Sequence, residues 1–147
     1  MKHLILPLLV GLLLPGPAAA AKYNIDGNHT QVNFTYLHGG YANLGGRLNQ
    51  VTGTLDFDPE RPAKASIEVQ IPMSSLSTGV PKLDSHLAGA DFFETEKFPT
   101  ASFASRKVTV LGKNRLSVAG DMTLHGVTRP VVVEVTIIRA GVHPMRK

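Results

Sequence analysis

The chain has 147 residues and a formal net charge of +4, and it contains no cysteine and no tryptophan. This length suits one domain of roughly 100–150 residues rather than two. A hydrophobic fraction of 43% beside a charged fraction of 18% is typical of a globular protein and excludes wholesale disorder. The absence of cysteine excludes a disulfide scaffold, a thiolate metal site and a cysteine nucleophile.

The N-terminal segment has the three parts of a secretory signal peptide. Lys2 supplies positive charge, residues 4–14 form an apolar run interrupted only by Pro7 and Gly11, and alanines at 18–21 provide a cleavage site. The apolar run is too short to span a bilayer, which needs about 20 residues. We therefore expect residues 1–21 to be a signal peptide and residues 22–147 to form one exported domain, periplasmic or secreted. A membrane-anchoring N-terminus is the alternative.

Alternation of apolar and polar residues predicts β-strands through most of the mature chain. A change of phase near Ser105 predicts a β-bulge, and residues 112–114 predict a tight hairpin. Glycine pairs predict a loop over 39–46, and residues 125–130 predict a turn. The strands expected from the alternation cover about six segments, namely 31–36, 47–57, 66–71, 101–111, 116–124 and 131–138.

Residues 73–100 interrupt this alternation. Pro81 suits the first turn of a short helix around residues 79–90, with Leu83 and Leu87 on its apolar side. The sequence therefore predicts an all-β antiparallel fold with one short helical insert. The pattern alone leaves a sandwich and a barrel open, but the glycines at 53 and 120 favour the strongly bent strands of a barrel.

Several stretches, taken in order, resemble the YceI-like family of secreted proteins. They are residues 23–34 (YNIDGNHTQVNF), 53–59 (GTLDFDP), 75–99 (from SLSTG through DSHL and DFF to KFP), 103–105 (FAS) and 120–131 (GDMTLHGVTRPV). The resemblance implies an eight-stranded, lipocalin-like antiparallel barrel. It also implies an elongated apolar cavity that holds a polyisoprenoid, of the prenyl-quinone or polyprenyl type, in the periplasm.

Only about six strands are evident in the sequence, whereas the family barrel has eight. We therefore expect the domain over 22–147 to lack the C-terminal strands, through truncation or because a partner chain supplies the edge. An open sheet presents unpaired backbone groups, so edge pairing or a homo-oligomer is expected.

A long isoprenoid is bound mainly through buried apolar area, at about 0.8 kcal/mol for each CH₂ group. The predicted site is therefore a wall of apolar side chains without a strong polar anchor. The alternative is that the same residues fill the core of a small barrel. The predicted lining residues are Phe34, Tyr36, Val51, Leu55, Phe57, Val69, Ile71, Leu87, Phe92, Phe93, Phe98, Phe103, Val118, Met122, Leu124, Val133 and Val135.

Other chemistries have weaker signals. The five histidines of the mature chain, at 29, 38, 86, 125 and 143, lack metal-ligand spacing and are interpreted as loop residues that bond to the backbone. Serines at 74, 75 and 77 lack the nucleophile-elbow context of a hydrolase. Residues 106–147 hold eight basic and two acidic side chains but no aromatic residue, which argues against a nucleic-acid groove. We expect no enzyme, no metal and no cofactor beyond a non-covalent isoprenoid. The alternative function is a structural or stress-protective barrel with a filled core.

Overall fold

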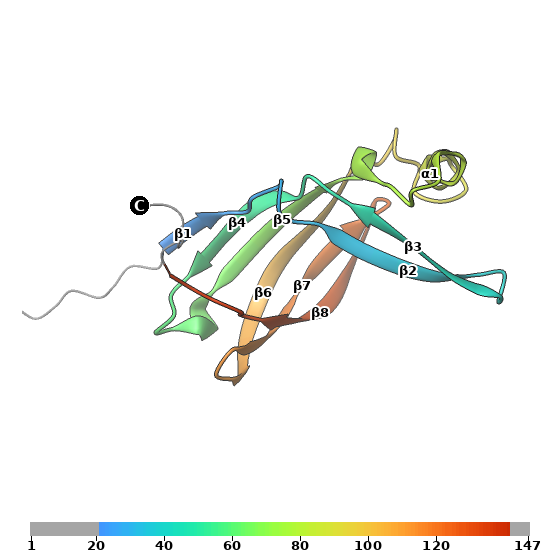
Figure 1. Cartoon of the computed structure of the whole chain (residues 1–147). Helices are drawn as coiled ribbons and strands as arrows, with labels where there is room; N and C mark the ends of the chain where they lie inside the picture. Colours follow the sequence, from blue (N-terminus) through green and yellow to red (C-terminus); the bar gives the residue numbers. More distant parts are fainter. Residues whose placement is uncertain (1–20, 142–147) are drawn as a thin grey trace, which may run out of the picture.

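The computed structural model describes residues 21–141 as a curved antiparallel sheet with a separate hairpin beside it (Figure 1). The signal peptide predicted over 1–21 lies outside the described residues except for Ala21, and so does His143. The elements are β1 (Ala21–Asn24), β2 (Val32–His38), β3 (Ala42–Leu48), β4 (Thr52–Phe57), β5 (Ser66–Pro72), α1 (Pro81–Ala88), β6 (Thr100–Gly112), β7 (Arg115–Leu124) and β8 (Val127–Thr136), with 3₁₀ turns at Pro62–Lys64 and Met73–Ser75.

Six strands form one sheet in the order β1-β4-β5-β6-β7-β8, and β2 pairs with β3 in a second sheet. An isolated bridge between Arg47 and Ser77 links β3 to the segment before α1, and Leu48 at the end of β3 packs in a core cluster with Ile71 of β5. The fold is therefore all-β and antiparallel, as predicted, with a barrel-like curvature. Its strands do not close into a continuous barrel over residues 21–141, because no described strand pairs with the outer edge of β8.

Two of the predictions about the strands are wrong. The described residues form eight strands, so the expectation of about six strands that lack the C-terminal ones is not supported. The two strands missed are β1, which has only four residues, and β3, which was predicted as a loop. Gly45 and Gly46 lie inside β3 and carry no side chains, so they hide its alternation.

The turn predicted over 125–130 is also wrong in extent, because β8 begins at Val127. His125 and Gly126 alone make the connection, with φ of 51° and 72°, as a two-residue hairpin turn requires. Pro130 lies inside β8 opposite Asp121. A proline is tolerated there because β8 is an edge strand and needs hydrogen bonds on one side only.

Three local predictions are confirmed. The pairing of β6 with β7 shifts register between Ser105 and Lys107, which is the expected bulge. Lys113 and Asn114 make the tight turn between the same strands. The helix α1 occupies the predicted insert, with Pro81 at its start.

Curvature of the sheet depends on a glycine at a close approach of two strands. Gly53 in β4 has φ of +152° and lies directly against the backbone of β5, where a Cβ would meet the carbonyl group of Glu68. A side chain at this position would push the strands apart, so the glycine permits their bend.

Candidate ligand-binding pocket

The concave face of the six-stranded sheet holds an apolar pocket of about 390 Å³. All six strands contribute to it, from Tyr23 in β1 to Val135 in β8. The segment after β8 completes the wall, because Ile137 and residues 139–141 run back across the end of the sheet towards β1 (Figure 1). The volume falls within the range of about 300–1,000 Å³ that is typical of small-molecule sites.

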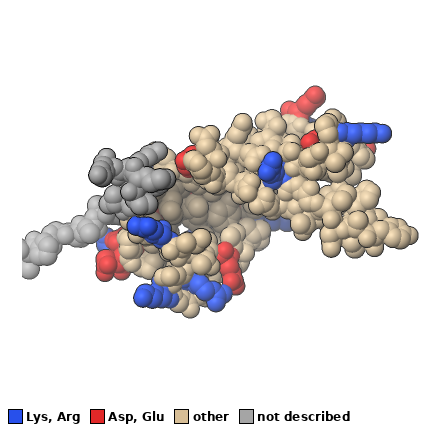
Figure 2. Space-filling model, in the orientation of Figure 1, with Lys and Arg blue, Asp and Glu red and all other residues tan. Residues whose placement is uncertain are grey.

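The wall of this pocket is almost entirely hydrocarbon. Among its described lining residues, Tyr23, Ser66 and Arg139 carry polar side-chain groups, and none is acidic. Figure 2 shows the hollow on this side of the molecule, mostly between uncharged residues, with Lys, Arg, Asp and Glu side chains around it. Such a surface favours the binding of an apolar molecule and offers few hydrogen-bond partners to a small polar one.

Some of the predicted lining residues lie in this pocket, and others lie in the packed core. Four of them, Leu55, Phe57, Val118 and Val135, line the pocket. Phe57, Phe103 and Val118 are buried in one core cluster, against which Leu55, Val69, Met122 and Val135 pack. Val51 and Ile71 are buried in a second cluster, at 1% and 4% exposure, and Val69 and Phe93 pack against it.

The remaining predicted residues lie around the hairpin, the insert and the open edge. The ring of Phe34 in β2 contacts that of Phe93 edge-on, and Leu87 of α1 is buried. Phe92 is 47% exposed beside His86. Tyr36 is half-buried, and its hydroxyl group has no hydrogen-bond partner within the described chain.

The turn between β7 and β8 contacts the insert over residues 73–100. The ring centroid of Phe98 lies 4.5 Å from that of His125, and His125 Nε2 lies 3.4 Å from Glu94 Oε2. Leu124 and Val133, predicted to line the cavity, are 39% and 42% exposed. Val133 lies opposite the buried Val118 and so faces the concave side, where it is exposed because β8 has no outer neighbour.

Several pocket residues were not predicted. Ile67, Leu116 and Ile137 alternate in phase with residues that were chosen, so the same pattern could have found them. Val108 follows the bulge, and the change of phase there was the available signal. Arg139 and Tyr23 had no such signal. The course of the segment after β8 brings Arg139 to this site, and the pairing of β1 with β4 places Tyr23 opposite Leu55.

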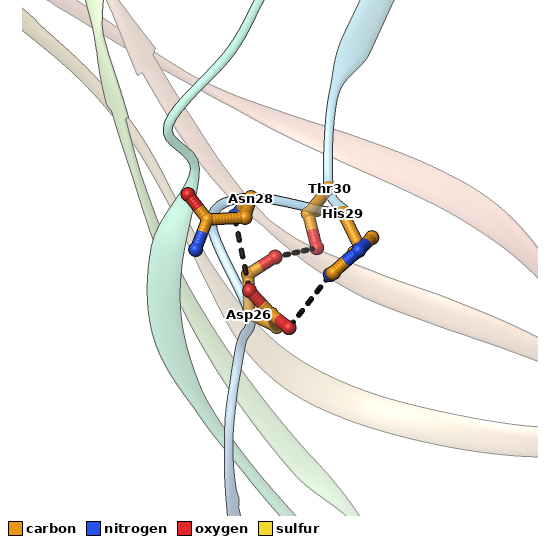
Figure 3. Close-up of polar contacts among 4 residues, drawn as sticks. All are labelled: Asp26, Asn28, His29 and Thr30. Carbon is orange, nitrogen blue, oxygen red and sulfur yellow. Dashed lines mark hydrogen bonds and ion pairs between the residues drawn. The ribbon is translucent and has the colours of Figure 1, made fainter. Parts of the chain in front are cut away.

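The loop between β1 and β2 is held by a network around Asp26 (Figure 3). One carboxylate oxygen of Asp26 accepts the backbone N–H of Asn28 at 3.0 Å, and the other lies 2.8 Å from His29 Nδ1. The hydroxyl group of Thr30 donates to the Asp26 carbonyl at 2.7 Å. The imidazole of His29 thus bonds to a side chain rather than to the backbone, and this network fixes the turn that leads into β2.

Groups of three or more metal-ligating side chains are not found over residues 21–141. In the same part of the chain, no helix has the length and apolar character needed to cross a membrane.

Asp58, directly after β4, is the one buried acidic residue in the described chain. Its carboxylate accepts a bond from Arg61 Nε at 2.8 Å and another from the N–H of Glu60 at 2.9 Å. The hydrogen bond from the Arg61 guanidinium, followed by that from Glu60, lowers the pKa of Asp58 below its ordinary value of 3.8. The pair therefore fixes the turn over 58–62, next to the end of the pocket.

Comparison with known proteins gives the family. Residues 23–145 match the sequence profile of the YceI-like domain. The chain belongs to the YceI-like family. A UPF0312 protein of Vibrio parahaemolyticus is 37% identical over 139 residues, which cover 93% of this YceI-like chain and 74% of that protein.

Two solved structures resemble the YceI-like fold described above. BcnA of Burkholderia cenocepacia superposes with a TM-score of 0.69 at 25% identity, over 76% of this chain and 69% of that one. A polyisoprenoid binding domain from Saccharophagus degradans, implicated in plant cell wall breakdown, gives a TM-score of 0.50 at 15% identity, over 80% of this chain and 63% of that one. The second likeness concerns the fold alone.

Proposed function

We propose that this protein binds a long apolar isoprenoid lipid, of the polyprenyl or prenyl-quinone type, in the pocket on the concave face of its sheet. The observation that carries the proposal is the pocket itself, about 390 Å³ with a nearly continuous hydrocarbon wall from all six strands. Membership of the YceI-like family and the likeness to a polyisoprenoid binding domain support the same ligand class. Buried CH₂ groups contribute about 0.8 kcal/mol each, so an isoprenoid chain gains affinity from this wall without strong polar anchors.

The pocket has the properties of a carrier rather than of a catalyst. Its wall presents apolar side chains, and catalysis requires nucleophiles or proton donors placed at a reacting atom. We propose that the protein sequesters or carries its ligand in the periplasm, on the strength of the signal-peptide pattern of residues 1–21. Fractionation of cells that express the chain, with N-terminal sequencing of the mature form, tests this location.

A structural or stress-protective barrel without ligand is the second candidate. The observation that favours it is the packing of most predicted lining residues against one another in two buried clusters, with Val51 at 1% exposure. In this case the pocket is a packing feature rather than a binding site.

Organic extraction separates the two functions. Protein purified from a bacterial periplasm is extracted with solvent, and the extract is analysed by mass spectrometry. The carrier function predicts a polyprenyl species at a fixed ratio to protein. An empty extract, together with no uptake of an added prenyl quinone, would instead support the ligand-free barrel.

A further inference from the structure

The apolar pocket changes character at one end, where the segment after β8 crosses the sheet. Arg139 lies there and belongs to two walls at once, that of the apolar pocket and that of an adjoining recess of about 200 Å³. Lys113 and Asn114, from the turn between β6 and β7, line the same recess. A hydrogen bond from Ile137 N–H to the Asn114 carbonyl, at 2.8 Å, holds the segment against this turn.

The charged side chains that line the two cavities, Arg139 and Lys113, are both cations. Neither cavity has an acidic side chain among its described lining residues. Over residues 21–141, Arg139 and Lys113 make no ion pair, whereas the nearby carboxylates of Asp58 and Glu134 pair with Arg61 and Arg115. Arg139, at the end of the apolar pocket, and Lys113, in the adjoining recess, thus have no ion-pair partner in the described chain.

A guanidinium group recognises planar or tetrahedral oxyanions through paired, charge-assisted hydrogen bonds. An ammonium group adds a point charge beside it. A ligand that places a hydrocarbon tail in the apolar pocket would bring its head to Arg139 and the recess, because the two cavities share Phe57, Leu116, Ile137, Arg139 and Ala140.

We infer that Arg139, assisted by Lys113, binds the anionic head group, a phosphate or carboxylate, of an isoprenoid whose tail lies in the apolar pocket. This inference rests on the proposed function, since it places the head of the same ligand. It makes the preferred ligand an acidic isoprenoid rather than a neutral prenol or quinone, and it gives the ligand one orientation.

Three probes with the same tail test the assignment, namely radiolabelled farnesyl monophosphate, farnesoic acid and farnesol in equilibrium dialysis below their micelle concentrations. The native protein is expected to bind the monophosphate about tenfold more tightly than farnesol, with farnesoic acid showing whether a carboxylate suffices. Arg139→Gln is expected to remove most of this preference, and to lower the affinity for farnesol much less than that for the monophosphate, because the Arg139 side chain also lines the apolar pocket. Lys113→Gln is expected to give a smaller loss in the same direction.

Lys107→Gln is the matched control, since it removes a positive charge from an exposed residue that neighbours Val108 in β6 and points to the opposite face. An equal effect of this control, equal binding of all three probes, or a uniform loss for all probes in Arg139→Gln would each overturn the head-group assignment. Each of these three results would leave the proposed function intact. Failure of every probe to bind the native protein would overturn both.

Discussion

The ring of Phe34 in β2 meets the ring of Phe93 in the insert edge-on, with centroids 6.3 Å apart and an interplanar angle of 77°. Gly46, opposite Phe34 in β3, lies under the Phe34 ring, where a Cβ would come within 2.5 Å of Cζ. Because the β2–β3 hairpin is not part of the six-stranded sheet, this edge-to-face contact of Phe34 and Phe93 is one of the contacts that hold the hairpin in place. These aromatic side chains therefore join parts of the fold, in addition to covering its interior.

Replacing Phe93 by alanine should loosen the hairpin from the rest of the domain. We expect a loss of about 2–3 kcal/mol in the free energy of unfolding, because the change removes a half-buried ring and its aromatic pair. Urea denaturation followed by circular dichroism measures it. Phe92→Ala is the control, since Phe92 is 47% exposed and should lose less than about 1 kcal/mol. Equal losses of unfolding free energy in the two variants would show that the contact between Phe34 and Phe93 does not hold the hairpin.

Gly120 in β7 should not tolerate a side chain. A Cβ there would come 2.6 Å from Phe103 Cζ and closer still to the Ala104 carbonyl, within the paired region of β6 and β7. Gly120→Ala is therefore expected to cost about 1–3 kcal/mol of stability through overpacking. Gly112→Ala is the matched control, because nothing lies within 4 Å of a Cβ at that position. A Gly120→Ala midpoint in urea equal to that of the control would refute this reading.

The ion pair between Asp58 and Arg61 predicts a pH-dependent contribution to stability. Folding lowers the pKa of Asp58 below 3.8, so folding favours the carboxylate form. Its stabilisation is complete above the ordinary pKa and is lost as the pH falls through the lower folded-state value. Asp58→Asn should therefore be less stable than the native protein at pH 7, and the gap should close below about pH 3.8. A gap that is constant from pH 7 to pH 2 would contradict this.

The open edge of β8 should promote self-association. Its outer backbone groups have no partner strand in the described chain, and Val132 is 67% exposed on it. Edge strands of this kind pair with other chains, and a lysine on the edge suppresses such pairing. Sedimentation velocity should show concentration-dependent oligomers for the native protein and fewer for Val132→Lys. Thr109→Lys, on an exposed position of the interior strand β6, should leave association unchanged. A native protein that is monomeric at all concentrations would exclude edge pairing.

Sequence patterns predicted the parts of this fold that depend on local alternation. They found six strands, the bulge near Ser105 and the helix that begins at Pro81. They missed β3 because Gly45 and Gly46, which have no side chains, interrupt the alternation of apolar and polar residues in that strand. For the site, alternation identifies the residues on the concave face but not which part of that face stays unfilled. That depends on the curvature of the sheet and on the return of residues 137–141 across its end, which no local pattern contains.

The central claim is that an isoprenoid tail lies in the pocket formed by the six strands and by residues 137–141. Photo-crosslinking tests it most directly, with a benzophenone-bearing farnesyl analogue, digestion, and mapping of the labelled peptides by mass spectrometry. The account predicts labels around Leu55, Leu116 and Val135, which an excess of unlabelled polyprenol removes. Labels confined to the β2–β3 hairpin or to the insert, or labels that competition does not remove, would contradict it.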